Sequence, residues 1–138
     1  MRRITLGAAL AALTLGAAAA AAAPRAVAGR AASIGPHVYS TRLAGATPAV
    51  LNGTWRLTIN RRSFSVARGA ALAVSGTARI AGNRITFHDL AGPFSCRGAQ
   101  ATAVYAWRVG GNRLTLIPVR EPCAGRRTIL TRPFTRIL

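Results

Sequence analysis

The stretch Gly53–Asn60, GTWRLTIN, has the alternating pattern of a half-buried β-strand. Trp55, Leu57 and Ile59 point to one side of this strand, and the polar side chains between them point to the other. The tryptophan lies two residues after a glycine, just inside the start of the strand. The stretch predicts one strand of a sheet, and the role of its tryptophan depends on the rest of the chain.

Short strands separated by turn signals lie on both sides of this stretch. HVYSTRL (37–43) precedes it, and a short helical segment is expected before Gly53, with Thr47 as a cap and Pro48 at its first position. Gly76 indicates a bulge or a sharp bend in the strand expected over 72–80. The strands expected after Asn60 are SFSVA (63–67), LAVSGTARI (72–80), RITFHDL (84–90), ATAVYAWRV (101–109), RLTLIPV (113–119) and TILTRPFTRI (128–137).

These segments predict an all-β protein, an up-and-down antiparallel barrel of about eight strands, because that number lets a small sheet close on itself. In this order the tight turns at 60–62, 81–83 and 110–112 fall at one end of the barrel. The helical segment and the loops that carry Cys96 and Cys123 fall at the other. The two cysteines therefore lie on neighbouring loops, and a disulfide there contributes about 3–4 kcal/mol by loop closure.

Alternation assigns the apolar side chains to one face of the sheet and the arginine, serine and threonine side chains to the other. The aromatic residues of the apolar face either fill a small barrel or line a pocket that opens at the end with the cysteines, with the segment near Pro48 as a lid. The residues that we expect to contact a ligand are Trp55, Phe64, Phe87, Tyr105, Trp107 and Phe134. The full apolar set is Trp55, Leu57, Ile59, Phe64, Val66, Leu72, Val74, Ala78, Ile80, Ile85, Phe87, Tyr105, Trp107, Val109, Leu114 and Leu116.

The first residues have the pattern of an export signal. Two arginines precede a long uncharged, alanine-rich run, and cleavage is expected after Ala22 or Ala28. An uncleaved leader would instead anchor the protein in a membrane. We expect a signal peptide (1–28), a flexible lead-in (29–36) and the barrel (37–138), secreted or held in the cell envelope. An even number of cysteines fits that oxidising location.

The charge is strongly positive, with 19 basic residues against 2 acidic ones and a formal net charge of +17. Every basic residue is an arginine. The excess of arginine has two explanations. Either the surface binds anions, or the codons of a genome rich in G and C favour arginine. The charge allows polyanions as partners, bound without sequence preference. Specific nucleic-acid recognition is not expected, because the aromatic residues share the buried face. We expect a monomer.

Catalytic groups are scarce, so no enzymatic activity is expected. His88 and Asp89 are neighbours on a strand and therefore face opposite sides of the sheet. Asp89 and Glu121 are the only carboxylates, which leaves almost nothing for acid–base catalysis. The spacing of the histidines and cysteines matches no metal-ligand pattern, so neither a metal nor a cofactor is expected.

Gly53 and Trp55 at the head of a strand in a small exported barrel resemble the calycin proteins, which include the lipocalins and the fatty-acid-binding proteins. The segments NRITFHDLAGPFSC, YAWRVGGNRLTLIPVREPCAGRR and LTRPFTR resemble more closely a group of small bacterial secreted lipocalin-like domains. The chain departs from lipocalins in having a candidate strand before Gly53 and in lacking their long C-terminal helix.

The resemblance implies that Trp55 packs across one end of the barrel beneath an arginine, Arg132 or Arg136. If that face of the last strand points inward, the arginine would instead hold a ligand carboxylate. The function that the resemblance implies is non-covalent binding of a small hydrophobic or amphipathic molecule inside the barrel. The alternative is a filled, structural barrel whose cationic surface adheres to polyanions or to acidic components of the envelope.

Overall fold

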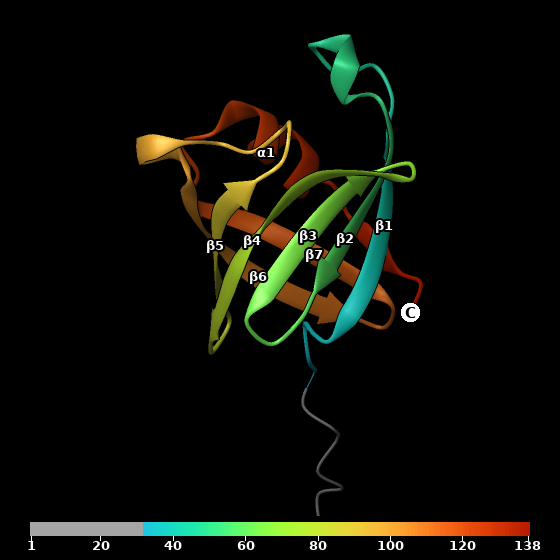
Figure 1. Ribbon diagram of the computed structural model, residues 1–138. Helices are drawn as coiled ribbons and strands as arrows, with labels where there is room; N and C mark the ends of the chain where they lie inside the picture. The colour runs from blue at the N-terminus through green and yellow to red at the C-terminus, as the bar shows by residue number, and fades with distance from the viewer. Residues whose placement is uncertain (1–31) are drawn as a thin grey trace, which may run out of the picture.

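The chain forms a closed β-barrel in a computed structural model that describes residues 32–138 (Figure 1). Eight antiparallel strands follow one another around the barrel in chain order, and pairing of β8 with β1 closes it. The predicted all-β, up-and-down barrel of about eight strands is confirmed. Its elements are β1 (His37–Leu43), the 3-10 helix η1 (Ala49–Leu51), β2 (Gly53–Ile59), β3 (Ser63–Arg68), β4 (Ala71–Ala81), β5 (Arg84–Ala91), the 3-10 helix η2 (Gly98–Gln100), β6 (Thr102–Gly110), β7 (Arg113–Arg120), α1 (Ala124–Leu130) and β8 (Phe134–Arg136).

The two ends of the barrel differ in their connections. The tight turns β2–β3, β4–β5 and β6–β7 lie at one end, which we call the turn end. The connections that carry η1, η2 and α1 lie at the other end, which we call the cysteine rim. The short helix expected before Gly53 is η1, but Pro48 is its cap rather than its first residue, and no side chain caps it.

Gly76 makes the bend in β4 possible. The register of β4 against β5 shifts between Ser75 and Gly76, which confirms the predicted bulge. A Cβ atom at Gly76 would lie 2.0 Å from the His88 carbonyl oxygen and 2.8 Å from the Phe64 ring. Only glycine allows the two strands and the core ring to approach so closely.

The core lies inside the barrel, as the alternation of side chains predicted. Trp55, Phe87 and Tyr105 are fully buried, and Trp107 and Val109 are partly buried against the same core. Two members of the predicted apolar set are exceptions, since Leu72 and Ile80 are exposed. A register shift between β3 and β4 turns the pattern around near Leu72. Ile80 lies where the β4–β5 hairpin extends past β3.

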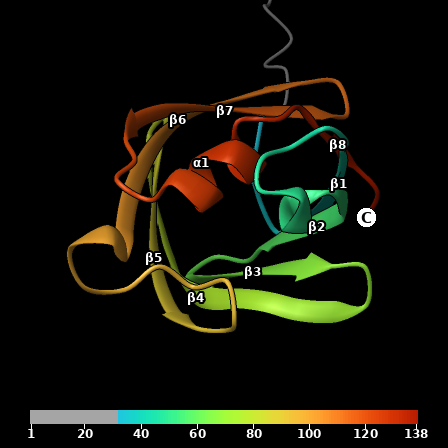
Figure 2. The same cartoon turned by 90° about the horizontal axis from the view of Figure 1, so that it is seen from above.

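The prediction of one long C-terminal strand over 128–137 was wrong. The structure has α1 (Ala124–Leu130) there, and β8 contains only Phe134–Arg136. Arg126, Ile129 and Leu130 are buried, and their spacing of three and four residues is that of one helix face. The helical pattern was not recognised in the sequence, because Arg126 was counted as a polar position. α1 lies within the ring of strands when the barrel is viewed from above (Figure 2).

The described chain begins ahead of β1. Ile34, in the predicted lead-in (29–36), is buried, and its carbonyl oxygen accepts a hydrogen bond of 2.8 Å from the Tyr39 hydroxyl. The end of the lead-in is therefore packed against the barrel. The predicted signal peptide and its cleavage sites lie outside the described residues. Within the described residues, no helix is long and apolar enough to cross a membrane.

Candidate anion-binding groove

The aromatic side chains predicted as ligand contacts gather in the barrel. Phe64 lies edge-on to Phe87 and Phe87 to Tyr105, with ring centroids 4.7 Å and 6.0 Å apart. Trp107 packs against the core from its margin. Trp55 and Phe134 are fully buried. These six residues, expected to line a ligand pocket, are thus members of the core or its border.

Little open space remains beneath the cysteine rim. An apolar cavity under α1 measures only about 40 Å³, whereas small-molecule sites usually measure about 300–1,000 Å³. The mouth of the barrel is covered by α1, and η1, the segment near Pro48, lies beside it (Figure 2). Binding of a lipocalin-sized ligand inside the barrel therefore requires α1 to move. The cavity is lined by Leu51, Phe64, Val66, Val74, Phe94, Gly125, Arg126, Ile129 and Leu130.

A buried ionic cluster holds α1 in the mouth. The Arg126 guanidinium donates to Glu121 through Nε, at 2.8 Å, and through Nη2, at 3.0 Å. Its Nη1 lies 2.9 Å from Asp89 Oδ1, an ion pair without hydrogen-bond geometry. The same guanidinium donates to the carbonyl oxygens of Ala101 and Gln100, so α1 is tied to the β5–β6 loop. Buried charges persist only when they are paired in this way.

Tyr105 completes the ionic cluster, since its hydroxyl donates a hydrogen bond to Glu121. Burial raises the pKa of Tyr105, and the hydrogen bond and negative charge of Glu121 raise it further. Burial by itself would lower the pKa of Arg126, but the hydrogen bond to Glu121 and the charge of Asp89 outweigh it and raise that pKa. The tyrosine therefore stays neutral and the arginine stays charged.

The disulfide between Cys96 and Cys123 adjoins this cluster, with Cα atoms 6.3 Å apart, and confirms the predicted pairing. The backbone N–H of Cys96 donates to Asp89 Oδ2 at 2.7 Å, and that of Cys123 donates to Glu121 Oε1 at 2.8 Å. Both carboxylates of the chain are thus used at the rim, and their residues are only 5% and 9% exposed. The sequence pattern indicated only that two carboxylates are too few for acid–base catalysis, and it did not predict that Arg126 and the cysteine backbone hold them together.

The outer surface consequently carries arginine without an exposed aspartate or glutamate side chain. Of the fifteen arginines in the described residues, thirteen are exposed, Arg68 is half-buried and Arg126 is buried. Such a surface attracts anions, and the attraction weakens with added salt.

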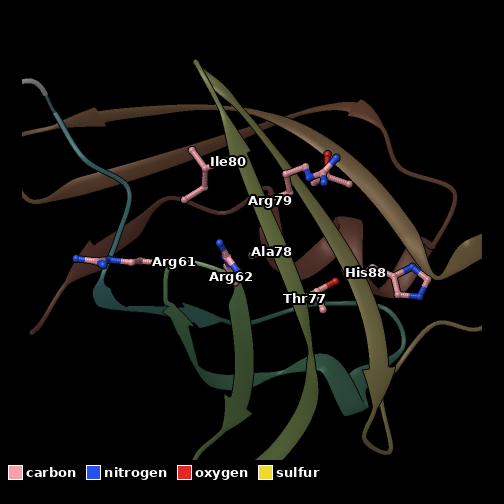
Figure 3. Close-up of a pocket in the computed structure, with 8 residues that line it drawn as sticks. Arg61, Arg62, Thr77, Ala78, Arg79, Ile80 and His88 are labelled. Atoms are coloured by element: carbon pink, nitrogen blue, oxygen red, sulfur yellow. The ribbon is translucent and has the colours of Figure 1, made fainter.

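A groove at the turn end concentrates these cations. β4 pairs with β3 only as far as Thr77, but it continues beside β5 to Ala81, so the β4–β5 hairpin projects past the β2–β3 turn. The groove between them has a volume of about 830 Å³. In Figure 3, Arg61 and Arg62 come from the β2–β3 turn, Thr77, Arg79 and Ile80 come from β4, and His88 lies on β5, across β4 from the two turn arginines. Its full lining is Arg61, Arg62, Thr77, Ala78, Arg79, Ile80, Thr86 and His88.

Two neutral polar side chains of the groove, Thr77 and His88, belong to a row that crosses four strands. Ser63, Thr77, His88 and Thr102 occupy consecutive partner positions across β3, β4, β5 and β6. The Nδ1 atom of His88 lies 2.7 Å from the Thr102 hydroxyl, a hydrogen bond that orients the imidazole. Its neighbour Asp89 is buried on the opposite face of β5, as alternation predicted. The groove therefore offers guanidinium, hydroxyl and imidazole groups together.

Neither C-terminal arginine is buried in the barrel interior. Arg132 is exposed and precedes β8, and Arg136 is exposed with its Nη1 atom 3.5 Å from His37 Nε2. On β8 Phe134 is buried, whereas Arg136, which has the same parity and pairs with Tyr39, is exposed at the turn end. The arginine opposite Trp55 is instead Arg68, its partner in the β2–β3 ladder. The Trp55 indole N–H donates to the Leu51 carbonyl oxygen at 2.8 Å.

Sequence reasoning placed Arg79 on the outer face but did not predict the groove. The available signal was the unequal length of the segments SFSVA (63–67) and LAVSGTARI (72–80). A longer strand paired with a shorter one leaves a projecting hairpin. The concave surface arises from that mismatch.

No match for the chain was found among protein-family models, curated proteins or solved structures. The fold is consistent with a lipocalin-like barrel in strand number and order. In the part of the chain that the structure describes, no three histidine, cysteine, aspartate or glutamate side chains gather as metal ligands.

Proposed function

We propose that this protein is a non-enzymatic, polyanion-binding barrel whose principal contact site is the groove at the turn end. The observation that carries the proposal is a groove of about 830 Å³ lined by three arginines, two threonines and a histidine, without a carboxylate. Guanidinium groups present several N–H donors in a planar fork that matches the oxygens of phosphate, sulfate and carboxylate.

The contacts are expected to be with the charged backbone of the polymer. Proteins that bind single strands through their bases need exposed aromatic rings for stacking. Every tryptophan, tyrosine and phenylalanine of the described residues is buried or partly buried. A linear anion would thus be held by its charges, without recognition of its sequence.

A filled barrel supports this proposal over interior ligand binding. The cavity under α1 measures about 40 Å³, and the disulfide and the buried ionic cluster both oppose movement of α1. Binding of a hydrophobic molecule inside the barrel stays a prediction. The disulfide fits a secreted or envelope location, which we include in the proposal.

The experiment compares heparin binding by the wild type and two charge-matched variants. In Arg62→Gln/Arg79→Gln the groove loses two cations. In the control, Arg108→Gln/Arg113→Gln, two exposed arginines outside the groove are lost. We expect wild-type affinity to fall steeply from about 50 to 200 mM salt. We expect the groove variant to bind at least about tenfold more weakly at low salt, the equivalent of 1.4 kcal/mol, and the control to lose much less.

Two results would contradict the proposal. Absence of salt-sensitive heparin binding by the wild type would refute polyanion binding altogether. Equal losses in the two variants would show that total charge, rather than the groove, determines the affinity.

A further inference from the structure

A recess at the cysteine rim lies outside the barrel interior and apart from the groove. It is bounded by the start of β2, the β3–β4 hairpin and the loop after β5, and its volume is about 410 Å³. That volume falls within the range of about 300–1,000 Å³ that is usual for small-molecule sites. The recess is therefore large enough for a ligand that the interior cavity is too small to hold.

The walls of the recess are mainly apolar. Leu72 is 54% exposed there, because the register shift between β3 and β4 turns it away from the core. Pro93 and the partly buried Phe94 lie across from it in the loop after β5. The Phe94 ring packs edge-on against Trp55, with centroids 5.5 Å apart, so this wall is anchored to the core.

One cation lines the recess, and the backbone fixes its position. The Arg68 Nε–H donates to the Asn52 carbonyl oxygen at 3.1 Å. Gly53, at the start of β2, has φ +132°, a backbone conformation that favours glycine, and a Cβ there would be in ordinary contact with Arg68 Nε, at 3.4 Å. Within the described residues, the Nη atoms of Arg68 have no protein acceptor among the side-chain hydrogen bonds. The guanidinium thus keeps free donors at the edge of an apolar surface.

We propose that this recess binds a small amphiphile with an anionic head, an alkyl carboxylate, outside the barrel. The carboxylate accepts hydrogen bonds from the Nη atoms of Arg68, and the alkyl chain lies against Leu72, Pro93 and Phe94. An apolar wall beside a single oriented charge selects a molecule that has both parts. In the Gly-x-Trp stretch of this chain, Trp55 anchors Phe94 and Gly53 supplies the positive φ at the start of β2.

Phe94 also separates the recess from the cavity under α1, because its side chain lines both. Truncation of this side chain joins the two spaces. The variant Phe94→Ala is therefore expected to gain affinity for longer alkyl carboxylates relative to shorter ones, a change that a merely exposed surface would not show.

The test measures binding of decanoate and of decanol, which has the same chain length but no charge, by calorimetric titration of the disulfide-bonded protein below the micelle concentration. We expect Arg68→Gln to weaken decanoate binding about tenfold, the loss of one charge-assisted contact, and to leave decanol binding unchanged. Leu72→Ser should weaken both. Arg56→Gln is the control, since Arg56 is exposed on β2 and lines neither the recess nor the groove.

The proposal is overturned if wild-type protein binds no decanoate, or if Arg68→Gln and Arg56→Gln weaken it equally. Thermal unfolding of Arg68→Gln checks its fold. The variant Arg68→Lys, which keeps the charge but not the fork, should retain part of the preference for decanoate over decanol. Heparin binding by the same samples reports on the groove, so failure of this proposal is distinguishable from failure of polyanion binding.

Discussion

The two ends of the barrel use arginine in opposite ways. At the cysteine rim, Arg126 is buried with both carboxylates of the chain and ties α1 across the mouth. At the turn end, Arg61, Arg62 and Arg79 line an open groove and are exposed. The same side chain therefore stabilises the fold at one end and remains available to a ligand at the other.

The difference follows from where the acidic residues lie. With only 2 acidic residues against 19 basic ones, pairing of both with Arg126 leaves the other arginines of residues 32–138 without a carboxylate partner. Removal of a buried, paired charge leaves its partners buried without a counter-charge and lowers stability strongly. Removal of an exposed charge lowers stability little.

Arg126→Met should lower the free energy of unfolding by about 3–5 kcal/mol, because it leaves the buried carboxylates of Asp89 and Glu121 without their cation. Arg127→Met, the next residue on α1 but exposed, should change it by less than about 0.5 kcal/mol. Urea unfolding at neutral pH measures both. Similar values for the two variants would show that the ionic cluster does not stabilise the rim.

Replacing both cysteines, Cys96→Ser/Cys123→Ser, should cost about 3–4 kcal/mol, since the open loop regains conformational entropy in the unfolded chain. The wild type unfolded with urea in the presence of a reducing agent is the matched control and should give the same midpoint. An unchanged midpoint in either case would mean that α1 is held without the disulfide.

Tyr105 should make stability fall at alkaline pH. Its pKa in the folded protein is raised above the ordinary value of 10.0 by burial first and by Glu121 second. The folded state thus holds the proton that the unfolded state releases, so the contribution is complete below pH 10.0 and is lost as the pH rises above it. The loss for one such group is about 1.4 kcal/mol per pH unit.

Tyr105→Phe provides the check on this pH dependence. Its unfolding free energy, measured between neutral and strongly alkaline pH, should decline less steeply than that of the wild type. Tyr39, whose pKa burial also raises against the opposing charge of Arg136, leaves a residual slope in both proteins. Identical slopes would refute the assignment to Tyr105.

The groove variant Arg62→Gln/Arg79→Gln should have the smallest effect on stability, within about 0.5 kcal/mol of the wild type. In the wild type, the Arg62 and Arg79 side chains make no ion pair and are exposed. Urea unfolding and heparin binding on one preparation test the contrast directly. A large loss of stability would place these arginines with Arg126 as structural residues.

Several features of the molecule were accessible from local patterns. Alternation around Trp55 and in the other strands predicted the buried face, because a period of two is a property of neighbouring residues. The turn signals between the strands predicted the strand order and the shared rim of Cys96 and Cys123. The pattern failed at Leu72, where a register shift between strands reverses it, and at α1, where Arg126 occupies an apolar helix face.

Amino-acid order alone was thus sufficient for an eight-stranded antiparallel barrel with its disulfide, since each depends on spacing along the chain. The pairing of Arg126 with Asp89 and Glu121, the plug of the mouth by α1, and the groove beside the projecting β4–β5 hairpin required the folded molecule. The physical reason is that charge pairing and cavity shape depend on distances between segments far apart in the chain, which no local period contains.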